Sequence, residues 1–220
     1  MYQYLFDASA IVDFYTRSNH RASRILDHIV EQRTYREAVL FLPTFCITEV
    51  FNVLARLCFE QKKLSNAKYK EHLGQFRKHI HWASLFYPYE LSRYHVLATD
   101  EIIPIEYATE RQSTPHREAV RDRLSGIDIL LIAMASELSY IHGNRNMYLI
   151  TGDSRIKRVC ENLRNSPKEE REYSREPRPL GHPHLQRWPV PNVFDLHHDV
   201  PAVLPTIERQ KPLNLRQISS

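Results

Sequence analysis

The sequence has no hydrophobic run long enough to span a membrane. Its longest uninterrupted apolar stretch covers residues 129–135, whereas a transmembrane helix needs about 20 apolar residues. The N-terminal residues, MYQYLFDAS, have neither the basic start nor the apolar stretch of a signal peptide. We therefore expect a soluble, cytoplasmic protein with no membrane partner.

Cysteine is scarce, and neither sign of charge dominates. Cys46, Cys58 and Cys160 form no CxxC pair, and three thiols give no disulfide framework. A reducing compartment is consistent with this pattern. The 30 Lys and Arg residues are set against 26 Asp and Glu, which leaves a formal charge of +4, so overall charge identifies no partner.

Short apolar runs alternate along the chain with segments of helical periodicity. Residues 4–6, 39–42 and 147–151 are predicted to be buried strands, each followed by a helix, and residues 193–196 could return as an edge strand. This alternation is typical of an α/β fold with a mainly parallel sheet. In such sheets ligands bind at the carboxyl ends of the strands.

The helical segments differ in character. Thr44 is the expected N-cap of a helix that follows the second strand, and Ser125 begins a buried helix that is nearly all apolar over residues 129–138. Residues 66–110 are expected to form two or three amphipathic helices around a possible strand at residues 84–87.

Four acidic residues stand at strand ends or helix starts: Asp7, Glu49, Asp128 and Asp153. An α/β topology would bring these positions to the same edge of the sheet. Carboxylates that converge repel one another and need cations, and an all-oxygen site suits Mg²⁺ or Mn²⁺. Such ions activate water and stabilise charge on a scissile phosphate, so the pattern predicts phosphodiester hydrolysis.

Each acid taken singly also has a structural explanation. Asp128 lies three residues after Ser125, which is the spacing of a capping box. Asp7 and Asp153 could be N-caps, and Glu49 could be an exposed residue of an amphipathic helix. The metal site therefore depends on the convergence of the four acids.

Four motifs resemble, in order, the acidic motifs of PIN-domain ribonucleases, and among these VapC-type toxins most of all: DASAIVDFY, PTFCITEVFNVLARL, GIDILLIAMASEL and YLITGDSRI. The resemblance covers residues 1–60 and 120–165. It implies a PIN-like α/β/α sandwich, with a nuclease core over residues 1–165 and a polar insertion, possible edge strand and tail over residues 166–220. The chain departs from compact toxins in its long stretch before the third motif.

The resemblance also implies roles for particular residues and partners. The four acids would bind Mg²⁺ or Mn²⁺ and catalyse endonucleolytic cleavage of RNA that leaves a 5′-phosphate. Ser9 and Thr151 would orient the metal ligands or the substrate, and Asp13 and Ser154 are weaker candidates. A cognate antitoxin protein and a homodimer are expected from the same resemblance.

Cations and aromatic residues could bind the nucleic acid. Arg155, Lys157 and Arg158 follow the last acid on a helix and could contact flanking RNA phosphates, although they could equally form a solvated helix face. The polar residues 164–191 are expected to form a long loop or an ordered insertion, and the tail over residues 201–220 is expected to be an arm or disordered. Four residues of this region could stack on unpaired bases or anchor the loop: Tyr173, His182, His184 and Trp188.

Three other hypotheses remain open at this point. The chain could be a catalytically silent PIN-like scaffold that binds RNA or protein. It could be a phosphatase or receiver domain with Asp7 as phospho-acceptor, although no DxD motif follows the first strand. The pairs His182 and His184, and His197 and His198, could suggest zinc, but they lack cysteine partners and helical ligand spacing.

Overall fold

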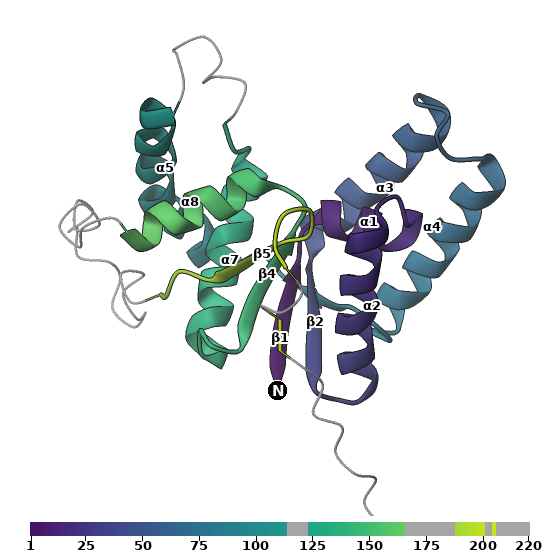
Figure 1. The fold of residues 1–220 in the computed structure, drawn as a ribbon, viewed down its shortest axis with the longest axis horizontal. Helices are drawn as coiled ribbons and strands as arrows, with labels where there is room; N and C mark the ends of the chain where they lie inside the picture. The colour runs from purple at the N-terminus through teal and green to yellow at the C-terminus, as the bar shows by residue number, and fades with distance from the viewer. Residues whose placement is uncertain (114–122, 166–187, 201–203, 206–220) are drawn as a thin grey trace, which may run out of the picture.

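The computed structural model describes residues 1–113, 123–165, 188–200 and 204–205. Its centre is a five-stranded, all-parallel sheet in the order β3-β2-β1-β4-β5 (Figure 1). The strands are β1 (Tyr2–Phe6), β2 (Ala38–Pro43), β3 (Tyr87–Tyr89), β4 (Met147–Thr151) and β5 (Asn192–Asp195). The predicted parallel sheet and the predicted edge strand near residue 193 are confirmed.

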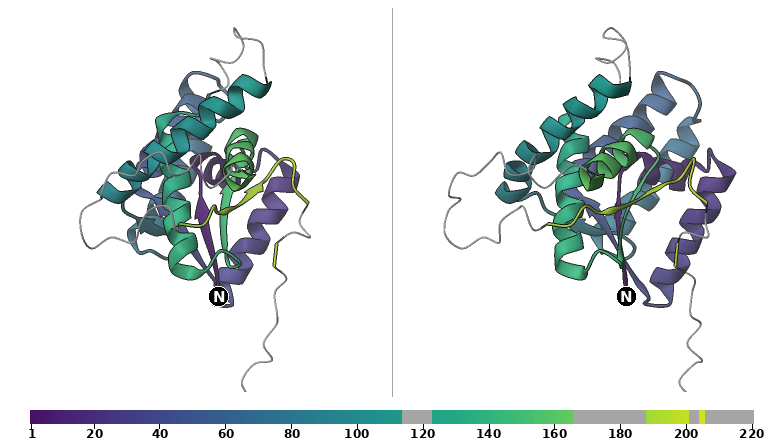
Figure 2. Two further views of the ribbon diagram at one scale, coloured as in Figure 1. Left: turned by 90° about the vertical axis from the view of Figure 1, so that its left-hand side faces the viewer. Right: turned by 60° about the vertical axis from the view of Figure 1, so that its left-hand side comes forward.

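Helices cover both faces of this sheet, so the predicted α/β/α sandwich is also confirmed. One layer contains α1 (Ala8–Thr16), α2 (His20–Thr34), α3 (Thr44–Phe59) and α4 (Asn66–His81). The other contains α5 (Arg93–Ser113), α7 (Gly126–His142) and α8 (Ser154–Asn165). Figure 2 shows α5 on the outer side of α7.

The central strands are buried on both faces, as expected where helices cover both sides of a parallel sheet. Tyr4, Leu5 and Phe6 in β1 are at most 1% exposed, and Phe6 lies in register with Ile150 of β4. This explains why the strands appear in the sequence as continuous apolar runs rather than alternating ones.

Two local predictions are wrong. Thr44 is the first residue of α3 rather than its N-cap, because β2 runs directly into the helix and Pro43 takes the N-cap position. The strand expected at residues 84–87 lies at Tyr87–Tyr89 instead, where Pro88 is tolerated because β3 is an edge strand. The helix α2 was not predicted.

Other features of the fold concern the end of α7 and the residues after β5. Gly143 ends α7 with a φ of 83°, in the region that favours glycine. Leu204 is buried, and the carbonyl of Pro205 accepts a hydrogen bond from Gln32 of α2 at 2.7 Å. No described helix is both long and apolar enough to cross a membrane. Most of the predicted insertion, including Tyr173, His182 and His184, lies outside the described residues.

Candidate metal centre at the carboxyl edge of the sheet

The topology creates one place where neighbouring strands lead to opposite sides of the sheet. From β1 the chain moves outward to β2 and β3, and then returns to β4 on the other side of β1. Ligands of open α/β sheets bind at the carboxyl ends of the strands at such a switch point. Asp7 directly follows β1, and Gly152 and Asp153 directly follow β4.

Asp7 is the most buried of the four predicted acids, with 6% of its surface exposed. Its Oδ2 accepts hydrogen bonds from Ser9 Oγ at 2.6 Å and from Thr151 Oγ1 at 2.8 Å. Although Asp7 occupies the N-cap position of α1, its side chain makes no capping hydrogen bond. Its carboxylate therefore faces the site rather than the helix end.

The two hydroxyls are themselves fixed by the backbone of the β4–α8 junction. Ser9 Oγ accepts from the backbone N of Gly152, and Thr151 Oγ1 accepts from the backbone N of Asp153, both at 2.9 Å. Each hydroxyl therefore accepts one hydrogen bond from a backbone N–H and donates one to the Asp7 carboxylate. This arrangement fits the orienting role expected for Ser9 and Thr151.

Glu49 and Cys46, on the first turns of α3, lie close to Asp7. A donor atom from each of these three residues lies within 4.8 Å of the other two. Cys46 is buried, and burial followed by the charges of Asp7 and Glu49 raises the pKa of its thiol. The thiol is therefore protonated at neutral pH, which leaves the two carboxylates as the charged donors.

The electrostatics of the acids indicate that Asp128 belongs to the same group. Burial is the main cause that raises the pKa of Asp7, and the charge of Asp128 adds to it. The pKa of Glu49 is also raised, by burial and then by the charges of Asp7 and Asp128. Without a cation, the site resists ionisation of both Asp7 and Glu49.

Asp128 is at the same time the capping-box residue that its spacing suggested. Its Oδ2 accepts hydrogen bonds from Ser125 N and Ser125 Oγ, both at 2.8 Å, and its backbone N donates to Ser125 Oγ. The box fixes the first turn of α7, which is the turn that carries Asp128. The structural and the functional explanations of this residue are therefore compatible.

Asp153 is engaged differently from the other three acids. Its Oδ1 accepts the backbone N–H of Arg155 at 2.8 Å, so it caps α8, and its carboxylate binds the Arg155 guanidinium. Burial alone would raise the pKa of Asp153, but the hydrogen bonds and charge of Arg155 outweigh burial and lower it. The structure thus brings Asp7 and Glu49 together, with Asp128 near enough to act on both electrostatically, while the Asp153 carboxylate pairs with Arg155.

The cations predicted to bind RNA have partners within the chain. Arg155 binds Asp153, and its Nη1 donates to the carbonyl of Arg123 at 3.1 Å. Lys157 forms an ion pair with Asp199, which raises the pKa of the lysine. Arg158 acts electrostatically on Asp153. These side chains stabilise the β4–α8 region in this structure.

His197, in the turn after β5, was considered from the sequence only as part of a possible zinc pair, and the structure places it beside Gly152 instead. Its Nδ1 is 3.0 Å from Asn19 Nδ2, and its Nε2 is 3.5 Å from Asp13 Oδ2. A Cβ at Gly152 would lie 2.8 Å from the His197 Nε2 and 3.3 Å from Ser9 Oγ. An added Cβ at position 152 would therefore require the His197 imidazole to shift, because the ring packs directly onto the glycine backbone.

Two further residues have packing roles. Trp188, a candidate for base stacking, packs against the core with its ring centroid 6.1 Å from that of His95. His198, part of the possible zinc pair, binds Asp195 instead. Cys46, Cys58 and Cys160 are all buried free thiols, as the odd count predicted.

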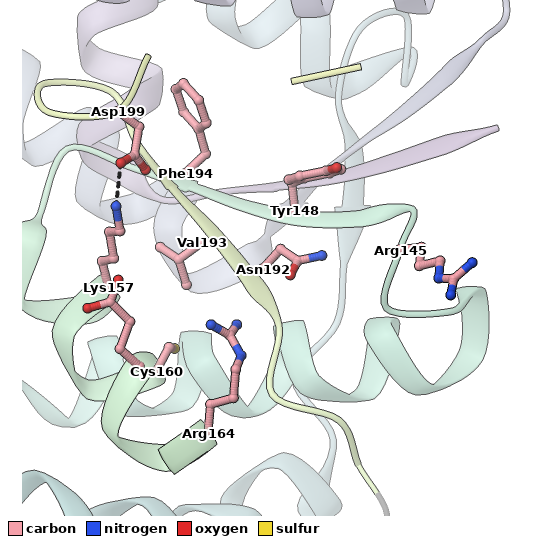
Figure 3. A pocket seen from close by; sticks show the side chains of 10 residues that line it. Arg145, Tyr148, Lys157, Cys160, Arg164, Asn192, Val193, Phe194 and Asp199 are labelled. Carbon is pink, nitrogen blue, oxygen red and sulfur yellow. Dashed lines mark hydrogen bonds and ion pairs between the residues drawn. The ribbon is translucent and has the colours of Figure 1, made fainter. Parts of the chain in front are cut away.

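A separate cavity of about 460 Å³ lies between α8 and β5 (Figure 3). Its lining includes Tyr148, Cys160 and Arg164 and does not include Asp7, Glu49 or Asp128. Burial raises the pKa of the Cys160 thiol to about 12. Arg164 donates to the carbonyl of Pro191 at 3.0 Å. The cavity is therefore distinct from the acidic group.

Comparison with known proteins gives only distant structural similarity. No protein-family model and no curated protein matches the sequence. One similar structure is VapBC2 from Rickettsia felis, which was solved bound to a DNA fragment from its promoter. The TM-score is 0.44 and the sequence identity is 12%, and the match covers 71% of this chain and 92% of that one. PAE2754 from Pyrobaculum aerophilum is similar with a TM-score of 0.37 and 19% identity, over 70% of this chain and 82% of that one.

Proposed function

We propose that this chain is a metal-dependent endoribonuclease of the PIN type. The observation that supports the proposal is the grouping of Asp7, Glu49 and Asp128 at the switch point of the sheet, where the charge of Asp128 raises the pKa of both Asp7 and Glu49. Three independent structural roles would not require these carboxylates to converge. Cation binding explains why they do.

The donor set fits Mg²⁺ or Mn²⁺ better than a softer metal. Asp7 and Glu49 offer carboxylate oxygens within 4.8 Å of each other, and hard divalent cations prefer oxygen ligands. The nearby Cys46 is the soft donor, but its raised thiol pKa opposes its use as a thiolate. In the proposal, Asp7, Glu49 and Asp128 hold the cation.

A bound Mg²⁺ or Mn²⁺ supplies activation of a water molecule and stabilisation of negative charge on the scissile phosphate. The chain supplies the geometry. Ser9 and Thr151 fix one oxygen of Asp7 through two hydroxyl hydrogen bonds. Glu49 is exposed on α3, so a phosphodiester can approach the group from its side.

Asp153 is proposed as the fourth acid of the site. Its carboxylate is bound by Arg155, so direct metal binding requires that arginine to release it. In the same way, Arg155 and Lys157 can contact RNA phosphates only by exchanging their present carboxylate partners. Arg158 is the third cation proposed to contact RNA on this helix.

RNA as substrate, an antitoxin partner and a homodimer rest on the resemblance of the four motifs to VapC-type toxins. VapBC2 is itself described with promoter DNA. Purification with the product of a neighbouring short open reading frame tests the antitoxin, and light scattering tests the dimer.

RNA cleavage tests the proposed activity. Wild type, Asp7→Asn and Asp128→Asn are incubated with RNA in Mg²⁺, in Mn²⁺ and in chelator, after circular dichroism has confirmed that each is folded. Asp27→Asn is the matched control, because Asp27 is an exposed acid paired with Arg17 on the α1–α2 side. We expect cleavage by wild type and the control only, and only with metal.

Two results would contradict the proposal. Cleavage by the Asp7 and Asp128 variants at the wild-type rate would show that the acidic group is not the site. Absence of both cleavage and Mn²⁺ binding in calorimetry for the wild type would favour the catalytically silent scaffold.

A further inference from the structure

The helix α4 carries a line of basic residues along one side. The line begins at Lys70 and continues 7, 8 and 11 residues later with Arg77, Lys78 and His81. Gly74 lies between Lys70 and Arg77. Residues spaced in this way share one face of an α-helix. We call these five residues the basic strip.

The strip is exposed and is not neutralised by neighbouring acids. Lys70 and Lys78 are exposed, and their side chains make no hydrogen bond or ion pair with any residue that the structure describes. The Arg77 guanidinium lies over the Phe51 ring at 5.9 Å. Glu71 is the acid on the same helix, and it accepts a hydrogen bond from Gln75. By contrast, Arg155 and Lys157 on α8 have carboxylate partners.

Gly74 is a second, independent feature of the strip. A glycine inside a helix costs about 1 kcal/mol relative to alanine, so a structural reason is expected. Close packing against the described residues does not supply one, because a Cβ at Gly74 would meet no atom within 4 Å. The glycine leaves the helix backbone bare at the centre of the strip, which suits close approach of a ligand.

The opposite face of α4 packs on α1 and α3, the two helices next to the proposed catalytic acids Asp7 and Glu49. Phe76 is buried, with its ring 5.3 Å from that of Phe51 on α3, the helix that carries Glu49. The Tyr15 hydroxyl of α1 is 2.6 Å from His79 Nδ1, and α1 begins directly after Asp7. Figure 1 shows α3 and α4 as a hairpin that extends past the carboxyl edge of the sheet.

An exposed aromatic residue lies at the end of the strip nearest the sheet. Trp82 follows α4 directly and is 76% exposed, and its ring packs against His81 with 4.8 Å between centroids. Proteins that bind single strands combine a cationic track for phosphates with aromatic side chains that stack on unpaired bases. The strip and Trp82 supply both parts.

From these features we propose that the basic strip and Trp82 bind single-stranded RNA on its path to the acidic group. This inference rests on the proposed function, because it identifies the strand conformation and the path of that substrate. Lys70, Arg77, Lys78 and His81 contact phosphates, Gly74 lets the RNA backbone approach the helix, and Trp82 stacks on a base. The paired cations of α8 are then not needed for the first contact.

Binding of a fluorescein-labelled oligouridylate tests the inference by fluorescence anisotropy. The measurements are made in chelator, so no cleavage occurs, and between about 50 and 200 mM salt. The strip variant is Lys70→Glu with Lys78→Glu. The matched control is Lys63→Glu with Lys68→Glu, two exposed lysines of the same hairpin outside the strip. Both variants change the net charge equally.

The strip variant should bind the oligonucleotide at least tenfold more weakly than the control does. Its slope of log affinity against log salt should be shallower by about 1.4, since each phosphate contact on a single strand contributes about 0.7. Trp82→Ala should weaken binding about tenfold with an unchanged salt slope, because stacking carries no charge. Equal weakening by the strip and control variants would overturn the inference.

Two further readouts separate this inference from the proposed activity. Hydrolysis of bis(p-nitrophenyl) phosphate with Mn²⁺ should be unchanged in the strip variant, because this small substrate reaches only the acidic group. If the strip bound the oligonucleotide but the wild type hydrolysed no phosphodiester, the proposed activity would be contradicted and the inference about the strip would stand. If polyglutamate displaced the oligonucleotide as well as unlabelled oligouridylate does, the strip would instead fit an acidic protein.

Discussion

A divalent metal should reverse the effect that replacing Asp7 with asparagine has on the stability of the protein. Asp7 is buried, and burial raises the pKa of its carboxyl group. Asparagine has nearly the same shape and can still accept the hydroxyl protons of Ser9 and Thr151 through its oxygen. The substitution thus removes a charge while it keeps the packing.

In chelator, Asp7→Asn should be more stable than wild type at neutral pH. A carboxyl group whose folded-state pKa lies above its ordinary value of 3.8 leaves stability intact below that value, and stability is lost as the pH rises from 3.8 through the raised pKa. Each unit by which the pKa is raised corresponds to about 1.4 kcal/mol. That energy shifts the melting temperature of a chain of this size by about 3–5 °C.

With Mn²⁺ present, the order should be the opposite. A ligand at 100 times its dissociation constant stabilises the folded state by about 2.7 kcal/mol, which raises the melting temperature by about 5–11 °C. Wild type should gain this increase and Asp7→Asn should lose most of it. Because protons compete with the metal for Asp7 and Glu49, the increase should shrink as the pH falls.

Differential scanning calorimetry with chelator and with Mn²⁺ measures both effects. Asp195→Asn is the control, because Asp195 is equally buried at a strand end but its carboxylate is used by His197 N and His198. This control should be destabilised in both buffers and should keep the response to Mn²⁺. An Asp7→Asn protein that is less stable in chelator, or equally stabilised by Mn²⁺, would refute the reasoning.

Three other substitutions separate the roles of neighbouring residues. Ser125→Ala should lower the unfolding free energy by about 1 kcal/mol and keep RNA cleavage, whereas Asp128→Asn should abolish cleavage. Arg155→Gln should tighten Mn²⁺ binding several-fold in calorimetry, because it frees the carboxylate of Asp153. An unchanged affinity would show that Asp153 is not a metal ligand. Gly152→Ala should lower the free energy of unfolding by about 1–3 kcal/mol, because the added Cβ clashes with the His197 imidazole. Urea unfolding should show that this stability is recovered when His197→Ala is added.

The fold was predictable where the sequence pattern is local and strong. The strands β1 and β4 are continuous apolar runs, and each ends on an Asp-containing turn, so both the sheet and the positions of Asp7 and Asp153 follow from the sequence. The helix α2 was missed although its Asn19 N-cap accepts two backbone hydrogen bonds, because its apolar positions are interrupted by charged residues. The short strand β3 was displaced because it has three residues and contains Pro88.

The interactions that were not predictable join residues far apart in the sequence. Lys157 of α8 pairs with Asp199, which lies in the segment after β5 that the fold brings back to α8. The contact of His197 with Gly152 depends on the same return, and the sequence signal available for it was the glycine itself. Cation patterns along one helix therefore could not show which charges are exposed. The structure reverses the expectation, since α8 cations are paired and the lysines of the α4 strip are not.

Asp128 shows why a structural explanation for a residue does not weigh against a catalytic one. Both hydrogen bonds from Ser125 go to the same oxygen, Oδ2, so the other oxygen is left for the site as far as the described residues show. The cap also restricts rotation of the carboxylate, which lowers the entropy that metal binding would otherwise cost. A serine that stabilises the helix by about 1 kcal/mol thus also orients a proposed metal ligand. Retained Mn²⁺ binding at reduced affinity in Ser125→Ala, with affinity lost in Asp128→Asn, would separate these two contributions.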